Sequence, residues 1–245
     1  MEQLLQKNES VGIADVIQPY QESYALFHFE RLRVNQLFTE AVRYPLVLVC
    51  AGAGYGKTCA VYDFAMEYQA PTAWMQISER DNVPERFWEN YARAWNQINE
   101  PFANAINKIG FPDTADKQQQ YLVVAQKLLS PLERRIFIVD DIHNLENPLL
   151  LRLSEQVVNN LAIGTTTIWI SRCTPRSNMA GMVSKGRVFN ISEGDLCFTE
   201  GELAHYLRRL DISPQPESLR EIMRDTEGWA FALNLIARSY RKAPG

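Results

Sequence analysis

The chain has 245 residues, a mass of 28.1 kDa, a formal net charge of −4 and an isoelectric point near 5.5. A chain of this length holds one large domain, or one domain with a small appendage, and buries enough surface to fold without disulfides or metal ions. With 46% hydrophobic and 22% charged residues, the composition is typical of a globular protein. The acidic balance argues against a nucleic-acid clamp within these residues, because such surfaces carry a basic excess.

No targeting signal is evident. Residues 1–10 lack the apolar core of a signal peptide, and the most apolar run, residues 45–53, is far shorter than the roughly 20 residues that span a bilayer. The cysteines form no C-x-x-C pair, so we expect them to be reduced residues of the core: Cys50, Cys59, Cys173 and Cys197. We therefore expect a cytoplasmic protein with no membrane partner.

Apolar runs and amphipathic segments alternate along most of the chain. After a polar N-terminal arm, residues 1–28, short apolar runs predict five strands, at 45–50, 71–77, 135–139, 166–170 and 187–191. Helical periodicity follows Gly56, begins again at Pro84 and covers 115–129 and 148–162, while 101–114 is less regular. Strands that alternate with helices predict an α/β fold with a five-stranded, mostly parallel sheet flanked by helices.

The pattern changes near residue 195. Thr199 and Glu202 have the spacing of a capping box, which predicts the start of a helix. Two further helices are expected from about Pro216 and about Trp229, with no additional strand. Residues 195–245 are therefore predicted to form a helical appendage, which we call the lid.

The segment after the first predicted strand has the pattern of a phosphate-binding loop (P-loop). It fits G-x-x-x-x-G-K-[ST], with Ala51 in place of the first glycine. The glycines let backbone N–H groups converge on phosphate oxygens, while Lys57 adds a positive charge and Thr58 a hydroxyl for Mg²⁺. We predict that these residues bind a nucleotide: Ala51, Gly52, Ala53, Gly54, Tyr55, Gly56, Lys57, Thr58 and Cys59.

Polar residues follow two later strands. Asp140 and Asp141 come directly after the third predicted strand, where ligands bind in open α/β sheets. We expect Asp140 to hold Mg²⁺ together with Thr58, and Asp141 to polarise the water that attacks the γ-phosphate. Arg172 follows the fourth strand, where its charge can report on the γ-phosphate. Lys57, Asp141 and Arg172 are the predicted catalytic residues; a surface ion pair is the alternative role for Arg172.

Together these segments resemble the nucleotide-binding module of the large ATP-binding LuxR-type transcriptional regulators, a family within the signal-transduction ATPases with numerous domains (STAND). The resemblance covers about Phe29 to Tyr240. It depends on A-G-A-G-Y-G-K-T at 51–58, W-M-Q-I-S-E-R-D-N-V-P-E-R-F-W at 74–88, V-D-D-I-H at 139–143, I-S-R at 170–172, L-C-F-T-E-G-E at 196–202 and E-G-W-A at 227–230. Generic P-loop proteins lack the second of these segments.

The resemblance also implies roles that the residue pattern alone does not give. It implies that Arg31 helps to hold adenine, although the stretch around it departs from the family pattern, and that Gly228, Trp229 and Ala230 approach the adenine or ribose. It implies a division into the arm (1–28), a P-loop domain (29–194) and the lid (195–245), which closes over the nucleotide.

At the level of function, the resemblance implies a slow ATPase whose bound ATP or ADP, with Mg²⁺, acts as a switch. We expect a module of a transcriptional activator that forms homo-oligomers when active. A small-molecule inducer and DNA would be bound by domains beyond this chain, which we expect to be a fragment. The alternative is a free-standing P-loop kinase or ATPase that acts on a small molecule.

Overall fold

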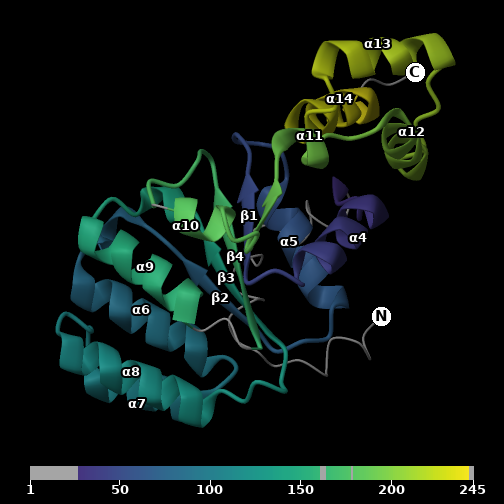
Figure 1. Ribbon diagram of the computed structural model, residues 1–245. Helices are drawn as coiled ribbons and strands as arrows, with labels where there is room; N and C mark the ends of the chain where they lie inside the picture. Colours follow the sequence, from purple (N-terminus) through teal and green to yellow (C-terminus); the bar gives the residue numbers. More distant parts are fainter. Residues whose placement is uncertain (1–26, 161–163, 178, 243–245) are drawn as a thin grey trace.

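A five-stranded parallel sheet forms the centre of the computed structural model, which describes residues 27–160, 164–177 and 179–242 (Figure 1). Its strands are β1 (Leu46–Cys50), β2 (Thr72–Gln76), β3 (Arg135–Asp140), β4 (Thr165–Ser171) and β5 (Val188–Ile191). They lie in the order β2-β3-β4-β1-β5, and every neighbouring pair is parallel. The predicted α/β sheet is therefore confirmed.

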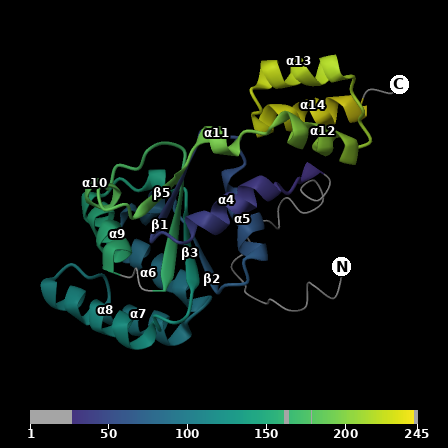
Figure 2. The same cartoon turned by 45° about the vertical axis from the view of Figure 1, so that its right-hand side comes forward.

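Strands β1–β4 are buried on both faces because their side chains alternate between two apolar clusters, whereas the edge strand β5 is only partly buried. Leu46 and Leu48 of β1 point into one cluster, whereas Val47 and Val49 point into the other. Helices α4 (Leu32–Ala41) and α5 (Lys57–Glu67) cover the second face. Helices α6 (Pro84–Asn96) and α9 (Pro148–Asn160) cover the first, with α7 (Glu100–Ile109) and α8 (Ala115–Leu128) packed outside α6 (Figures 1 and 2).

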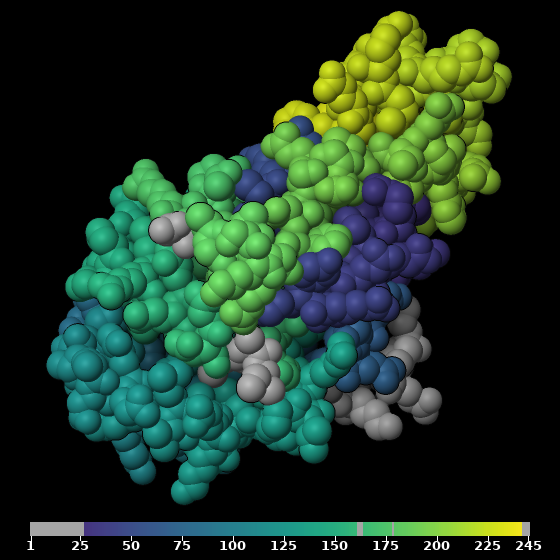
Figure 3. Space-filling model, in the orientation of Figure 1, coloured from purple at the N-terminus to yellow at the C-terminus, as the bar shows by residue number. Residues whose placement is uncertain are grey.

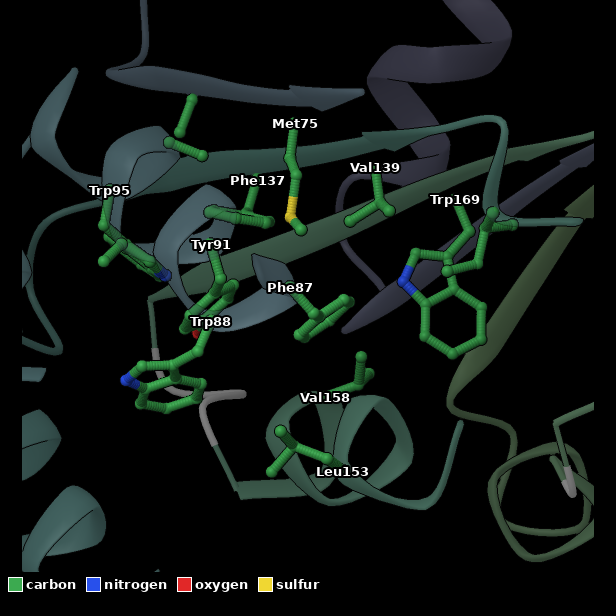
Figure 4. Close-up of a cluster of buried hydrophobic side chains, with 14 of the residues drawn as sticks. Met75, Phe87, Trp88, Tyr91, Trp95, Phe137, Val139, Leu153, Val158 and Trp169 are labelled. Atoms are coloured by element: carbon green, nitrogen blue, oxygen red, sulfur yellow. The ribbon is translucent and has the colours of Figure 1, made fainter. Parts of the chain in front are cut away.

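Aromatic side chains fill much of the core. Trp74 of β2 lies in the cluster on the second face, and α6 contributes four aromatic residues to the first: Phe87, Trp88, Tyr91 and Trp95. Each of these five side chains is at most 5% exposed. Figure 4 shows Phe87 and Tyr91 facing Phe137 and Val139 of the sheet, and the ring centres of Tyr91 and Phe137 are 5.2 Å apart.

Helix α7 covers residues 100–109, within the stretch 101–114 that was expected to be irregular, whereas residues 110–114 are in no helix or strand. Pro101 is the reason for the wrong prediction. A proline in the interior of a helix usually ends it, but a proline in the first turn is tolerated. Asn99 caps the helix by accepting a hydrogen bond from the Phe102 backbone N–H at 2.9 Å, and Phe102 and Ile106 bury one face of it.

The lid contains three helices, α12 (Glu200–Arg209), α13 (Pro216–Thr226) and α14 (Ala230–Lys242). The predicted capping box is present: the Glu202 N–H donates to Thr199 Oγ1 at 3.2 Å, and the Thr199 N–H donates to Glu202 Oε2 at 2.9 Å. The helices share an apolar cluster of their own, and they project from the body of the molecule as a separate lobe (Figure 3). The described residues also form two short α-helices, α10 (Ala180–Val183) and α11 (Glu193–Leu196), the latter leading into the lid, and two short 3-10 helices, η2 (Glu79–Asn82) and η3 (Ile142–Asn144).

The expected core position of the cysteines is wrong. Cys59 and Cys173 are exposed, and Cys50 and Cys197 are only half-buried. Cys50 ends β1 and Cys173 follows β4, where the sheet opens toward solvent, so a neighbouring apolar run did not imply burial. Within the described ranges, no helix is both long enough and apolar enough to cross a membrane. Most of the predicted N-terminal arm, residues 1–26, lies outside the described residues.

Candidate nucleotide-binding site

The predicted phosphate-binding loop connects β1 to α5 at the carboxyl edge of the sheet. Gly54 (φ +79°) and Gly56 (φ +75°) adopt the left-handed conformation that side chains disfavour. Lys57 begins α5 and is 8% exposed, and its Nζ donates to the Gly52 carbonyl at 2.7 Å. Burial, followed by the nearby charge of Arg172, lowers the pKa of Lys57. The loop therefore presents a largely desolvated cation where a phosphate would bind.

Thr58 and Asp140 meet across the site. The Thr58 hydroxyl donates to Asp140 Oδ2 at 3.1 Å, which joins the first turn of α5 to the end of β3. Burial, and then the charge of Asp141, raise the pKa of Asp140 to about 6. Hydroxyl and carboxylate oxygens are ligands that Mg²⁺ prefers. This pair fits the predicted metal site, with nucleotide phosphates and water supplying the other ligands.

Asp141 lies at the centre of a polar group. Its backbone is left-handed (φ +54°), and its N–H donates to Asp140 Oδ1 at 2.8 Å. Gln76 Nε2, from the end of β2, donates to Asp141 Oδ2 at 2.7 Å. The Arg172 Nε and His143 Nδ1 atoms lie 3.9 and 3.7 Å from Asp141 Oδ1. Burial lowers the pKa of His143. The carboxylate predicted to act on water is thus held by a hydrogen bond from Gln76 and lies near the positive charge of Arg172.

The first turn of α14 lies directly on the P-loop. The Trp229 indole N–H donates to the Ala53 carbonyl at 3.0 Å, and the Phe231 N–H donates to the Gly54 carbonyl at 3.0 Å. Ala230 lies beside the loop as well: a Cβ built on Gly56 would be 4.0 Å from the Ala230 Cβ. The lid therefore contacts the same loop that is predicted to hold phosphate.

Gly228 lets the lid make this approach. Its φ is +76°, its carbonyl accepts a hydrogen bond from the Phe198 N–H at 2.9 Å, and an added Cβ would lie 2.4 Å from the Phe198 carbonyl oxygen. No other residue type fits this close contact between two backbone segments.

Arg31 lies between the P-loop and the lid. It is 6% exposed, it donates to the Leu196 carbonyl, and its guanidinium lies 5.0 Å from the centre of the Phe198 ring. Burial lowers its pKa. Arg33, in the first turn of α4, donates to the carbonyls of Asp195 and Cys197, each at 2.8 Å. Helix α4 thus holds the segment that leads into the lid.

The structure brings the predicted site residues from β1, α5, β3, β4 and the lid to one edge of the sheet, while Cys59 is exposed on the first turn of α5. Sequence reasoning missed three polar residues at this edge. Gln76 could have been found, because it is a polar residue at the end of a buried strand, as Asp140 is. Glu193 accepts a hydrogen bond from the Gly52 N–H at 2.7 Å. No sequence pattern points to Glu193 or to Arg33.

The parallel sheet, the loop after β1 and the carboxylates that end β3 define the α/β fold of the P-loop NTPases. A Walker-type ATPase from Pyrococcus abyssi shares this fold at a TM-score of 0.51 and 14% identity, over 87% of this chain and 68% of that one. In sequence, the chain is similar to the HTH-type transcriptional regulator MalT. It is 26% identical to MalT of Cronobacter sakazakii over 223 residues (88% of this chain) and to MalT of Klebsiella pneumoniae over 220 residues (86%).

These relatives confirm the family resemblance that the sequence motifs indicated. The chain spans about a quarter of the length of the curated relatives, 24% in each case. No protein-family model matches the chain.

Proposed function

We propose that this chain is the ATP- and ADP-binding switch module of a MalT-like transcriptional regulator. The observation that supports this best is the direct contact between the P-loop and the lid. Because Trp229 and Phe231 bind the carbonyls of Ala53 and Gly54, a nucleotide in the loop would lie beside the first turn of the lid and could act on it. A nucleotide can bias such an arrangement only if it binds the docked and undocked lid with different affinity.

The residues at the site divide the chemistry between them. Lys57 neutralises charge on the β- and γ-phosphates. Thr58 and Asp140 would hold Mg²⁺, which when bound supplies further charge neutralisation on the phosphates. Asp141 polarises the attacking water, and Arg172 contributes positive charge near the γ-phosphate. Gln76 orients the Asp141 carboxylate through its amide N–H.

The role in the whole regulator follows from the same proposal. ATP with an inducer favours an oligomeric, DNA-binding state, and ADP favours rest. The inducer and DNA would be bound by other domains of a longer cytoplasmic protein. Turnover should be far slower than the roughly 1–10³ s⁻¹ of ordinary enzymes, because a switch must persist between signals.

Loss of Lys57 tests nucleotide binding. In Lys57→Ala, the affinity for ATP and ADP should fall by about 100-fold, since a charged hydrogen bond contributes about 1.5–3 kcal/mol. Isothermal titration measures this, and Lys127→Ala, an exposed lysine of α8, is the control. If the wild-type chain binds neither nucleotide below millimolar concentrations, the proposal is wrong.

Substitution of Asp141 separates hydrolysis from binding. Asp141→Asn should bind ATP about as well as the wild type but hydrolyse it roughly 10²–10⁴-fold more slowly, the usual contribution of a group that assists proton transfer. Phosphate release under single-turnover conditions measures the rate. Normal hydrolysis by this variant would remove Asp141 from the proposed role.

A kinase function has less support. A kinase lid needs basic residues over the transferred group, but the lid arginines of α13 pair with neighbouring carboxylates on its surface: Arg220 with Glu217, and Arg224 with Glu221 and Asp225. Transfer of the ATP γ-phosphate to a small molecule, at a rate exceeding hydrolysis, would reverse this conclusion.

A further inference from the structure

We propose that the chain has a second small-molecule site, which binds a small anion bearing a phosphoryl or carboxylate group. The site is a pocket at the amino-terminal edge of the sheet, which we call the arginine pocket and define by Arg43, Arg134, Arg135, Thr165 and Thr166. Its volume is about 280 Å³. This proposal is independent of the function proposed above.

The arginine pocket is far from the P-loop. It is lined by residues 42–45, which precede β1, by the start of β3 and by the start of β4. The nucleotide site lies at the opposite ends of the same strands. Arg135 and Asp140 are the first and last residues of β3, so the two sites are separated by about 17 Å at 3.3 Å per residue. An anion in the arginine pocket cannot be a phosphate of the P-loop nucleotide.

One buried side chain that lines the pocket has an unpaired donor. Arg135 is 4% exposed; its Nη2 donates to the Ser130 carbonyl at 2.9 Å and to Glu133 Oε2 at 3.2 Å, but its Nη1 has no hydrogen-bond partner. Most buried polar atoms are hydrogen-bonded, so an unpaired guanidinium nitrogen in a pocket-lining residue favours a ligand that supplies an acceptor.

The charge of the pocket indicates the sign of that ligand. Arg43 and Arg134 are exposed and line the same pocket, and neither side chain forms an ion pair within the described part of the chain. Glu133, 71% exposed, offsets one of the three positive charges. Such a concentration of positive charge in a chain of net charge −4 favours an anion.

The size and chemistry of the pocket narrow the ligand further. Guanidinium groups match the paired oxygens of phosphoryl and carboxylate groups, which accept two parallel hydrogen bonds. Tyr44 and Tyr68 close the wall around these groups. A volume of 280 Å³ is at the lower end for ligand pockets, so a small metabolite fits better than a nucleotide.

Isothermal titration at low salt tests the proposal, with inorganic phosphate and succinate as separate probes. The full chain is compared in four forms: wild type, Lys57→Ala, the double variant Arg43→Gln/Arg134→Gln, and the control Arg86→Gln/Arg93→Gln. The control removes two exposed arginines of α6 and so matches the loss of charge. Both double variants alter exposed side chains only, and a thermal melt checks that they fold.

At least one probe should bind the wild type, Lys57→Ala and the control alike, and should lose 10-fold or more in affinity in Arg43→Gln/Arg134→Gln. Binding of phosphate alone identifies a phosphoryl ligand, and binding of succinate alone a carboxylate. The proposal is overturned if neither probe binds, if Lys57→Ala abolishes all binding, or if the control loses as much affinity as the pocket variant. None of these outcomes depends on whether the P-loop binds ATP.

Discussion

At the scale of single residues, the lid can approach the P-loop closely because Gly54 has no side chain. Gly54 has a left-handed backbone, and a Cβ placed there would lie 2.7 Å from the Phe231 Cβ and 2.9 Å from the Trp229 Nε1. Real Cβ atoms do not approach other atoms so closely. The glycine is therefore needed both for the loop conformation and for the contact with α14.

Gly54→Ala, compared with a control glycine, should show how much stability comes from the contact with α14 and how much from the loop conformation. Alanine in a left-handed conformation costs about 1–2 kcal/mol, and the clash with α14 adds to that unless the lid moves away. Gly186→Ala is the matched control, because its φ is +62° but nothing lies within 4 Å of an added Cβ. We expect Gly54→Ala to lower the free energy of unfolding in urea more than the control, and to weaken ADP binding. Equal losses in the two variants would show that the contact with the lid contributes nothing.

The same residues show what sequence reasoning can find at a site. Lys57 and Thr58 were identified because a P-loop is contiguous in the chain, and Asp140 because it ends a buried strand. Glu193 lies 141 residues after Gly52, and no local pattern brings its carboxylate to the Gly52 N–H. Its position depends on the crossover that places β5 beside β1, which only the folded topology shows.

At the scale of elements, the prediction succeeded where local chemistry and packing agree. Strands β1–β4 were identified because their apolar runs are buried on both faces, and α12 because its capping box is explicit in the sequence. Helix α4 was not predicted: Arg31 precedes it without a side-chain cap, and its buried positions include the polar Asn35. Asn35 is buried because it donates hydrogen bonds to Glu30 and Glu67, which the sequence does not reveal.

The capping box at α12 predicts a measurable effect. Thr199→Ala removes the acceptor for the Glu202 N–H and should lower the free energy of unfolding by about 1 kcal/mol. Thr199→Ser keeps the hydroxyl and should recover most of this loss. The midpoints of urea unfolding compare the three proteins. If serine fails to recover the stability that alanine loses, the hydroxyl is not the stabilising group.

At the scale of the whole molecule, the lid and the sheet are joined through three short connections. Arg31 and Arg33 bind the carbonyls of residues 195–197, and Arg33 also pairs with Glu202 of α12. Phe29 packs against Phe198 and Tyr206 of the lid. The first turn of α14 binds the P-loop. Otherwise the lid projects from the body (Figures 1 and 3). Because these contacts are few, the lid can separate from the sheet at a low free-energy cost. A ligand that touches both parts can therefore shift the equilibrium between the docked and the undocked lid.

This arrangement predicts that ADP protects two distant segments together. At 100 times its dissociation constant, ADP stabilises the bound form by about 2.7 kcal/mol. If it contacts both the P-loop and α14, amide hydrogen exchange should slow by a similar factor at residues 53–56 and at residues 229–231. Lys57→Ala should remove both effects. Trp229→Phe, which keeps a ring but lacks the N–H that binds the Ala53 carbonyl, should retain protection in the loop and lose much of it in α14. Protection confined to the loop in the wild type would mean that the lid does not sense the nucleotide, and the switch would then have to act through another surface.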